Sequence, residues 1–361
     1  MKKYVTLGEV CTKGSSSIAQ KDIEQNNGSY GIYGASGYIK DVDFYHQDKP
    51  YIAVVKDGAG IGRTMLLPEK TSVIGTMQYL IPNDDVCVEY LCYAVTYMNL
   101  AKYFSGATIP HIYFKDYQKE KLPLLTIEEQ RKIADNLRKI DRVIELCSGI
   151  LQKLDVLVKS RFVEMFGEPI LNPKGWNMAT IGDIVTEVKY GTSKPAVDGG
   201  KYPYLRMNNL TYDGHLDLTD LKRIDIPDNE IEKCIVRKGD VLFNRTNSVE
   251  LVGKTCVFDE DEDMIIAGYI IRVRLKPVML PIVLSCFMNT DALKKKLRNM
   301  AKGAVNQANI NAQELQAINI YLPPLALQEQ FAAFVEQTDK SKFIAINIKK
   351  IIRRVRLNDQ F

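Results

Sequence analysis

The sequence has no long apolar run. None of its apolar stretches approaches the ~20 residues that a membrane-spanning helix needs, and the longest, around Val278 to Phe287, contains Pro281. The first residues, MKKYVTLGEV, also lack the apolar core of a secretion signal. We therefore expect a cytoplasmic protein that has no membrane partner.

Cysteine and histidine are too scattered to suggest a disulfide framework or a metal site. The seven cysteines form no CxxC pair, and the three histidines match no metal-ligand spacing. The acidic run Asp259–Asp263 is typical of a solvated loop. The net charge of +4 permits a polyanionic partner without requiring one. We predict no metal site and no bound cofactor.

Catalytic motifs are missing as well. Val252–Thr255 resembles the end of a phosphate-binding loop, but Ser248 stands where the first glycine of that loop should be. The glycines between Gly58 and Gly62 lie among short strands with no helix after them, which indicates a turn and not a dinucleotide site. The chain also lacks the Asn/Asp-Pro-Pro-aromatic tetrapeptide of base methyltransferases. We predict no catalytic residue.

What the chain does contain is one unit written twice. KLPLLTIEEQRKIADNLRKID at 121–141 aligns with IYLPPLALQEQFAAFVEQTD at 320–339 at a constant offset of 198 residues, so that Gln130 meets Gln328 and Asp141 meets Asp339. Val5–Thr12 likewise matches Ala179–Thr186, position by position. The parts follow one another in the same order in both halves. This pattern predicts a tandem duplication.

Each half reads as a mixed α+β globule followed by a long helix. Short β-branched or aromatic runs broken by Gly, Asn and Asp, such as YIAVVKDGAGIGRTMLL, are typical of antiparallel strands and turns. The predicted fold is α+β, with an internal pseudo-two-fold repeat. Its expected parts are a first globule at 1–124, a central helix at 125–167, a second globule at 168–323 and a C-terminal helix at 324–361.

Both predicted helices carry an apolar seam. In the first helix the seam is Ile133, Leu137, Ile140, Ile144, Cys147, Leu151, Leu154 and Val158. In the second helix we expect Phe331, Phe334, Thr338, Ser341, Ala345, Ile348, Ile352 and Val355. Neither seam can bury itself alone, so we predict that the two helices pair as an antiparallel coiled coil.

Polar and basic side chains in turns are the candidate DNA contacts. Arg pairs bidentately with guanine and Asn with adenine, while Lys suits phosphate. The candidates are Lys56 and Arg63 around the first glycine turn, Arg206, Asn208 and Asn209 after a tyrosine-rich strand, Arg245, Asn247 and Ser248 in a turn after Val241–Phe243, Lys254, and Lys302, Asn306 and Gln307 in the glycine loop of the second half, which follows a basic stretch with Lys294.

The order of these parts resembles a known family. A globule, a proline- and leucine-containing start to a long helix with Gln130, the linker Asn172–Trp176 and a second globule that opens with Thr180–Ile184 are similar to the specificity subunits of type I restriction–modification systems. The resemblance covers essentially the whole chain. It implies a non-catalytic reader of double-stranded DNA, in which each globule is a target recognition domain for half of a bipartite site.

The resemblance also implies partners. The long helices would space the two globules and dock two adenine-N6 methyltransferase subunits that hold S-adenosylmethionine, with ATP-dependent restriction subunits as a further partner. The expected docking residues are Glu128, Glu129, Gln130 and Arg131 in the first helix, and Gln328 and Glu329 in the second. Two other hypotheses stay open: a self-sufficient modification or restriction enzyme with a divergent site near Asp259–Asp263 or Gly58–Gly62, and a coiled-coil protein without DNA affinity.

Overall fold

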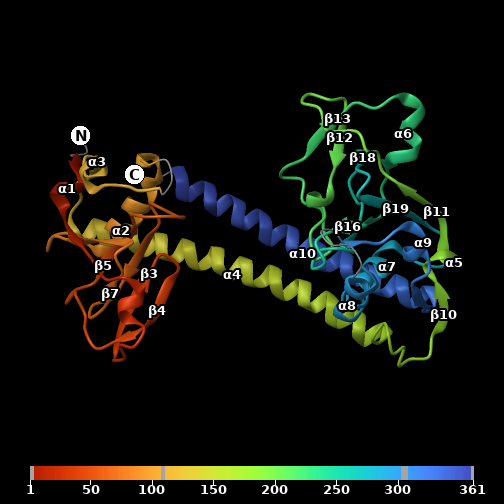
Figure 1. Ribbon diagram of the computed structural model, residues 1–361, viewed down its shortest axis with the longest axis horizontal. Coiled ribbons are helices and arrows are strands. Elements are labelled where there is room, and N and C mark those ends of the chain that lie inside the picture. Colours follow the sequence, from red (N-terminus) through yellow and green to blue (C-terminus); the bar gives the residue numbers. More distant parts are fainter. Residues whose placement is uncertain (1–3, 107–109, 302–307, 359–361) are drawn as a thin grey trace. The chain divides into compact units, whose positions relative to one another are not determined.

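The computed structural model describes residues 4–106, 110–301 and 308–358, with side chains as far as residue 354. The chain divides into two compact units. Unit 1 comprises Met1–Cys147 with Asn347–Phe361, and unit 2 comprises Ser148–Ile346. Each unit contains one globule together with part of both long helices, α4 (Ile127–Phe166) and α10 (Leu325–Asn358) (Figure 1). The predicted domain boundaries follow these elements and stay predictions.

Unit 1 is built on a four-stranded antiparallel sheet. Its elements are β1 (Tyr4–Thr6), α1 (Leu7–Val10), β2 (Cys11–Ser15), η1 (Gln20–Ile23), β3 (Tyr30–Gly34), β4 (Gly37–Val42), β5 (Tyr51–Val55), β6 (Thr64–Leu67), β7 (Ser72–Val73), β8 (Met77–Pro82), α2 (Val88–Tyr97), η2 (Leu100–Tyr103), α3 (Phe114–Tyr117) and β9 (Lys121–Pro123). The main sheet has the order β2-β8-β5-β6, and a second sheet has the order β4-β3-β7, with β3 and β7 parallel. All five residues of β5 are buried because they lie between the two cores.

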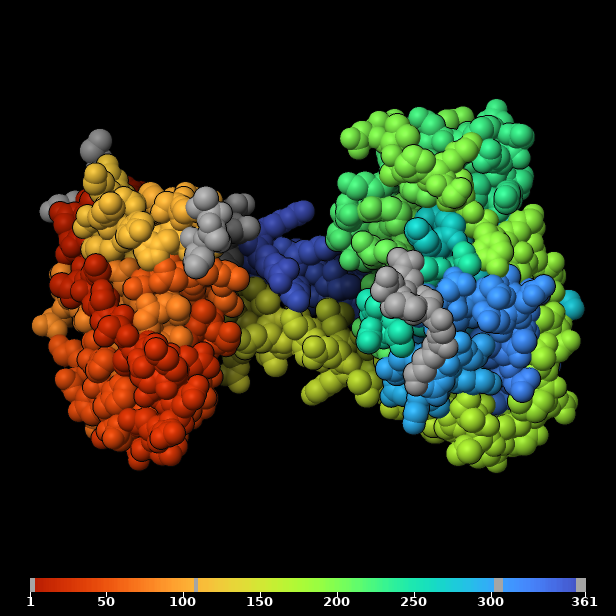
Figure 2. Space-filling view, viewed as in Figure 1, coloured from red at the N-terminus to blue at the C-terminus, as the bar shows by residue number. Residues whose placement is uncertain are grey.

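Unit 2 repeats this topology with additions. Its elements are β10 (Asn177–Thr180), α5 (Ile181–Ile184), β11 (Val185–Tyr190), β12 (Tyr202–Leu205), η3 (Met207–Asn209), β13 (Lys222–Ile224), α6 (Asp228–Cys234), β14 (Ile235–Val236), β15 (Val241–Asn244), β16 (Thr246–Asn247), β17 (Thr255–Val257), β18 (Met264–Ile266), β19 (Ile270–Leu275), α7 (Pro281–Met288), α8 (Asp291–Met300), β20 (Ala308–Asn309), α9 (Ala312–Gln316) and β21 (Asn319–Leu322). The main sheet, β11-β19-β15-β17, has the same order as in unit 1. The second sheet, β13-β12-β18-β14, lies with α6 in a lobe that Figure 2 shows in green.

The predicted duplication is confirmed down to strand register. β1 pairs with β9 so that Val5 lies opposite Leu122, and β10 pairs with β21 so that Ala179 lies opposite Ile320. These are the residues that the two sequence alignments match with each other. In both units the first strand therefore pairs with the strand that leads into the long helix, and the predicted α+β fold class is correct.

A buried glutamine attaches the first turn of each long helix to its own globule. The Gln130 side-chain oxygen accepts the backbone N–H of Cys87 (2.9 Å), just before α2, and the Gln328 oxygen accepts that of Leu280 (2.9 Å), just before α7. The side-chain nitrogens donate to the carbonyls of Asp85 and Leu125 in unit 1, and of Val278 and Pro323 in unit 2. We call this arrangement the glutamine clamp.

The glutamine clamp corrects two predicted partner contacts. Gln130 is 4% exposed and Gln328 is 0% exposed. Every polar atom of both side chains bonds to backbone within the same unit. Neither glutamine can therefore reach a docked subunit, because its hydrogen-bonding groups are already used and sealed from solvent.

Within unit 2 the two long helices pack antiparallel. The Phe331 ring of α10 lies with its centroid 5.6 Å from that of Phe162 and 5.3 Å from that of Phe166 in α4. Farther along, the Lys342 amine is 2.7 Å from the Asp155 carboxylate. Because residue numbers rise in one helix as they fall in the other, the contacts confirm the predicted antiparallel direction in this unit.

The seam of the second helix differs from the expected one. Val335 is buried and Lys342 is only 13% exposed, whereas Ser341, predicted for the seam, is exposed. The observed positions Phe331, Val335, Thr338, Lys342 and Ala345 keep the 198-residue offset from the first seam. Phe334 is partly buried against the same core, beside Val335. The prediction was wrong at Ser341, because it passed over a lysine whose charge Asp155 and Asp339 neutralise.

Candidate nucleic-acid interface

In unit 1 a glycine turn follows the central strand β5. The Val55 N–H donates to the Arg63 carbonyl (2.9 Å) and the Gly62 N–H donates to the Val55 carbonyl (2.8 Å), which closes the hairpin between β5 and β6. The segment before α3 lies against the same strand end, because the Ile112 N–H donates to the Lys56 carbonyl (3.0 Å). Three separate stretches of chain therefore meet where β5 ends.

Unit 2 builds the same junction from equivalent atoms. The Asn244 N–H donates to the Lys254 carbonyl (2.8 Å), the Gly253 N–H to the Asn244 carbonyl (2.9 Å), and the Ile310 N–H to the Arg245 carbonyl (2.9 Å). Lys56 thus corresponds to Arg245, and Arg63 to Lys254. We call these two equivalent regions the strand-end junctions.

Glycine is required at one position of each strand-end junction. Gly62 has φ +79° and Gly253 has φ +80°, in the left-handed region that L side chains rarely adopt. A Cβ would also meet the backbone N of Ala101 at 2.5 Å in unit 1, and the Leu297 Cδ1 at 2.6 Å in unit 2. These glycines therefore serve the packing of the hairpin, which in unit 1 agrees with the turn predicted at Gly58–Gly62.

At equivalent positions the two strand-end junctions each contain a pair of interacting polar side chains, and the residue types differ between the units. In unit 1, Asp57 contacts the His111 ring, and the His111 ring lies 4.1 Å from the ring of Tyr113. In unit 2 the equivalent residues are Thr246 and Asn309, and the Thr246 hydroxyl donates to the Asn309 Oδ1 (2.8 Å). We call these the bridge pairs. The sequence offered no sign of them, because their members lie more than 50 residues apart.

Lys56 and Arg245, the cations predicted at the ends of the central strands, differ in how firmly neighbouring residues hold them. Lys56 is partly exposed. The Arg245 guanidinium lies over the Tyr190 ring, 4.8 Å from its centroid, and its Nε is buried without a hydrogen-bond partner in the described part of the chain. Stacking on an aromatic face holds a planar guanidinium in one orientation. Arg245 is therefore a pre-oriented group.

The other two cations of the strand-end junctions, Arg63 and Lys254, differ in their exposure to solvent. Arg63 is exposed. Lys254 is 6% exposed, its amine donates to the Met207 carbonyl (2.6 Å), and burial lowers its pKa. A buried lysine that holds the loop after β12 is not available for phosphate. This arrangement corrects the predicted DNA contact of Lys254.

The predicted group after β12 is largely structural. The Asn209 Oδ1 accepts the Arg206 N–H (2.8 Å), and its Nδ2 donates to the Asp217 carbonyl (2.8 Å), with the side chain buried. The Arg206 guanidinium pairs with Asp220 (2.8 Å). Asn209 is therefore corrected from a base contact to a loop support, and Arg206 carries a carboxylate partner. Asn208 is exposed.

The predicted residues beyond Arg245 form a tight turn. The Asn247 Nδ2 donates to the Asn244 Oδ1 (2.9 Å), and its own Oδ1 accepts the Ser248 N–H (2.9 Å). Ser248 is exposed at the surface of this turn. Lys302, Asn306 and Gln307 lie outside the described residues. Lys294, in the basic stretch before them, is 2% exposed, and burial lowers its pKa to about 8, so it does not face phosphate.

The remaining helix residues predicted to contact a partner lie on the surface. Glu129 caps its helix, since its carboxylate accepts the N–H of Thr126 (2.9 Å), while Glu128, Arg131 and Glu329 are exposed. No helix of the described ranges is long and apolar enough to cross a membrane. In the same ranges no group of three or more His, Cys, Asp or Glu side chains is placed to hold a metal ion.

Comparison with known proteins points to one family. The model of the type I restriction modification DNA specificity domain matches residues 2–156 and 173–354. The type I restriction enzyme EcoKI specificity subunit of Escherichia coli is 23% identical over 344 residues, which are 90% of this chain and 69% of that protein. The MjaIX specificity subunit of Methanocaldococcus jannaschii is 30% identical over 156 residues, which are 36% of this chain and 35% of that protein. The match thus spans about one third of the length of the M. jannaschii protein.

Solved structures share the fold. The crystal structure of the type I restriction-modification system S subunit from M. genitalium has a TM-score of 0.58 at 14% identity, and the match covers 99% of this chain and 94% of that one. A chain from a structural study of complex assembly and conformational transition in a type I restriction–modification system also has a TM-score of 0.58, at 17% identity over 98% of this chain and 95% of that one. At this identity the likeness concerns the fold alone.

Proposed function

The chain belongs to the family of type I restriction modification DNA specificity domains, and from this premise we propose that it is the DNA-recognition subunit of a type I restriction–modification complex. The observation that carries the proposal is the pair of strand-end junctions. Two units with the same backbone hydrogen bonds present different side chains at equivalent positions. That combination suits two readers of two unlike sequences.

Each unit reads one half of a bipartite site in double-stranded DNA. In unit 2, Arg245 suits guanine and Asn309 suits adenine, because each side chain can form two hydrogen bonds to the edge of that base. In unit 1, Lys56 and Arg63 supply the positive charge that phosphate contacts require. Since the scaffold is shared, the side chains at the junctions set the difference between the two half-sites.

The chemistry belongs to partner subunits. Two adenine-N6 methyltransferase subunits that hold S-adenosylmethionine dock on exposed positions of the long helices, including Glu128, Arg131 and Glu329. ATP-dependent restriction subunits add cleavage. Two observations support a non-catalytic chain. The acidic run near Asp261 forms ordinary surface ion pairs, such as Asp261 with Lys238 (2.6 Å), and the glycine turn Gly58–Gly62 packs as a hairpin.

The experiment compares the chain alone with the chain and its methyltransferase. We expect no methyl transfer from S-adenosylmethionine by the purified chain, and sequence-specific adenine methylation once a methyltransferase subunit is added. The variant Asp259→Ala/Asp261→Ala should keep the full activity of the complex. Methylation by the lone chain, or loss of activity in that variant, would contradict the proposal and favour a self-sufficient enzyme.

A further inference from the structure

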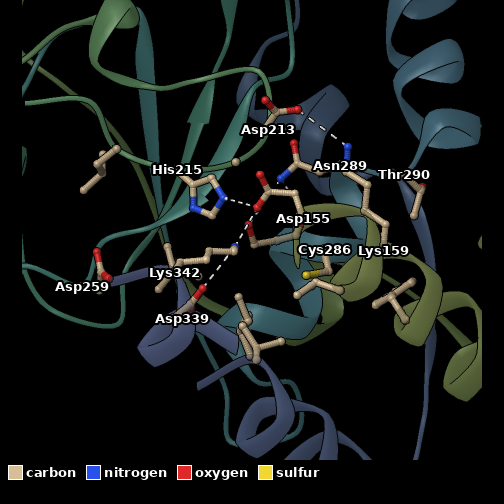
Figure 3. A pocket seen from close by; sticks show the side chains of 18 of the residues that line it. Asp155, Lys159, Asp213, His215, Asp259, Cys286, Asn289, Thr290, Asp339 and Lys342 are labelled. Atoms are coloured by element: carbon tan, nitrogen blue, oxygen red, sulfur yellow. Dashed lines mark hydrogen bonds and ion pairs between the residues drawn. The ribbon is translucent and has the colours of Figure 1, made fainter. Parts of the chain in front are cut away.

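Unit 2 contains a cavity of about 360 Å³ between the long helices and the globule (Figure 3). Its apolar wall comprises Val158, Phe162, Ile282 and Val335, from α4, α7 and α10. Segments at 213–216, 257–260 and 289–291 also line it. This size lies within the range of small-molecule sites, which are concave, mostly apolar and carry a few convergent polar groups.

The polar part of the cavity is acidic. Six carboxylates and two lysines line it, together with His215. Lys342 lies 2.7 Å from Asp155 and 3.2 Å from Asp339, and His215 lies 3.5 Å from Asp155 (Figure 3). The other lysine, Lys159, is 3.7 Å from Asp213. Within the described part of the chain, three lining carboxylates have no ion-pair partner within 4 Å: Asp259, Glu260 and Asp291. Surplus negative charge excludes nucleic acid and favours a cation.

The duplication makes unit 1 a reference for one wall of the cavity. The glutamine clamp aligns α2 with α7, and this alignment matches Tyr93 with Cys286. In unit 1 the Tyr93 hydroxyl donates to Asp141 (2.9 Å). In unit 2 the equivalent carboxylate is Asp339, and the short thiol side chain of Cys286 stands where unit 1 has the phenol. The two units therefore share the carboxylate and differ in the side chain beside it.

The thiol itself is not reactive at neutral pH. Burial raises the pKa of Cys286 to about 12, so the sulfur stays protonated. The cavity therefore suits reversible binding and not a covalent intermediate. Its apolar wall and its acidic side together match an aliphatic chain that carries positive charge.

We propose that this cavity binds a small organic cation of the aliphatic polyamine class. The methylene groups lie along Val158, Phe162 and Val335, where burial removes apolar surface from water. The ammonium groups meet Asp339 and the unpaired Asp259 and Glu260 as charge-assisted hydrogen bonds. The site is separate from the strand-end junctions and does not depend on the DNA-recognition role.

Calorimetric titration of the full chain with spermidine, in the absence of DNA, tests the proposal. We expect one saturable site, and much weaker heat with a neutral diol of similar length. Cys286→Tyr introduces the phenol that Tyr93 carries at the equivalent position of unit 1, and it should abolish binding because the ring occupies the cavity. Asp259→Asn/Glu260→Gln keeps the shape and should weaken binding about tenfold, since it replaces two carboxylates by neutral amides, which form weaker hydrogen bonds to an ammonium group.

The matched control is Asp261→Asn, which removes a carboxylate from the same loop but outside the cavity. It should leave spermidine binding unchanged. Thermal unfolding of each variant shows whether it is folded, and the double variant keeps the test valid if Cys286→Tyr is not. Absence of a saturable site, equal weakening by Asp261→Asn, or equal binding of Mg²⁺ and spermidine would overturn the proposal.

Discussion

Removing one glutamine clamp should destabilise one unit and spare the other. Gln328→Ala deletes a fully buried side chain and leaves the Leu280 N–H and the carbonyls of Val278 and Pro323 without their partner. An unsatisfied buried group costs about 1–3 kcal/mol, and the groups of Leu280 and Val278 cost less because they are only part-buried. We therefore expect a loss on the order of 2–4 kcal/mol, a large share of the ~5–15 kcal/mol that a domain has.

The chain carries its own reporter for this experiment. Its single tryptophan, Trp176, lies in unit 2, where the indole N–H donates to the Phe166 carbonyl (2.9 Å). Urea unfolding followed by tryptophan fluorescence therefore reports on unit 2, while circular dichroism follows the whole chain. Gln328→Ala should lower the midpoint seen by fluorescence. Gln130→Ala should leave that midpoint in place and shift a transition seen only by circular dichroism.

The control for Gln328→Ala is Glu329→Ala, the exposed neighbour on the same helical turn. It should change the unfolding free energy by less than about 0.5 kcal/mol, as surface substitutions usually do. If Gln328→Ala moves the fluorescence midpoint no more than Glu329→Ala does, the clamp contributes nothing and the reasoning fails. An equal shift of the Trp176 signal by Gln130→Ala would contradict the division into two units.

Three further substitutions test other parts of the account. Lys294→Met should remove a pH dependence of stability. The folded pKa of Lys294 (about 8) is below its unfolded value, so the unfolded chain binds one more proton than the folded chain between about pH 8 and 10.5. The unfolding free energy of the wild type should therefore rise relative to that of the variant by on the order of 3 kcal/mol across this window, measured by urea unfolding at pH 7 and pH 10. Arg272→Ala should destabilise unit 2 by about 2–4 kcal/mol in Trp176-detected unfolding, since the fully buried Arg272 side chain donates to the Ile235 carbonyl and pairs with Glu187, and its removal leaves a cavity and that carbonyl without its partner. No change would refute a structural role for Arg272. Arg245→Ala should weaken DNA binding by the methyltransferase complex about 10- to 100-fold at its specific site, with folding intact, whereas an unchanged affinity would remove Arg245 from the interface.

Much of the fold could be predicted because the duplication repeats a pattern of residues, and such a repeat can be detected in the sequence alone. The 198-residue offset paired Gln130 with Gln328 correctly, and the structure gives both the same hydrogen bonds. The same offset would also have placed Lys342 in the second helix seam. Hydrophobic periodicity passed over it, because an amine becomes a seam residue only when carboxylates such as Asp155 lie beside it.

Side-chain roles were harder to predict than strands and helices. Lys254, Asn209 and Gln130 are polar residues in turns or on a helix, and their type is the same whether they face solvent or a buried carbonyl. Which of the two holds depends on chain segments far away in the sequence. For the same reason no local pattern could bring Asp57 to His111.

The most direct test of the central claim is an exchange of one recognition half. Residues 1–124 are replaced by the matching segment of a family member with another target, and the methylated sites are mapped in DNA from cells that also produce the methyltransferase. The account predicts a split motif in which one half changes while the other half and the spacing between them stay the same. A motif that changes in both halves, or in neither, would contradict two independent readers on one scaffold.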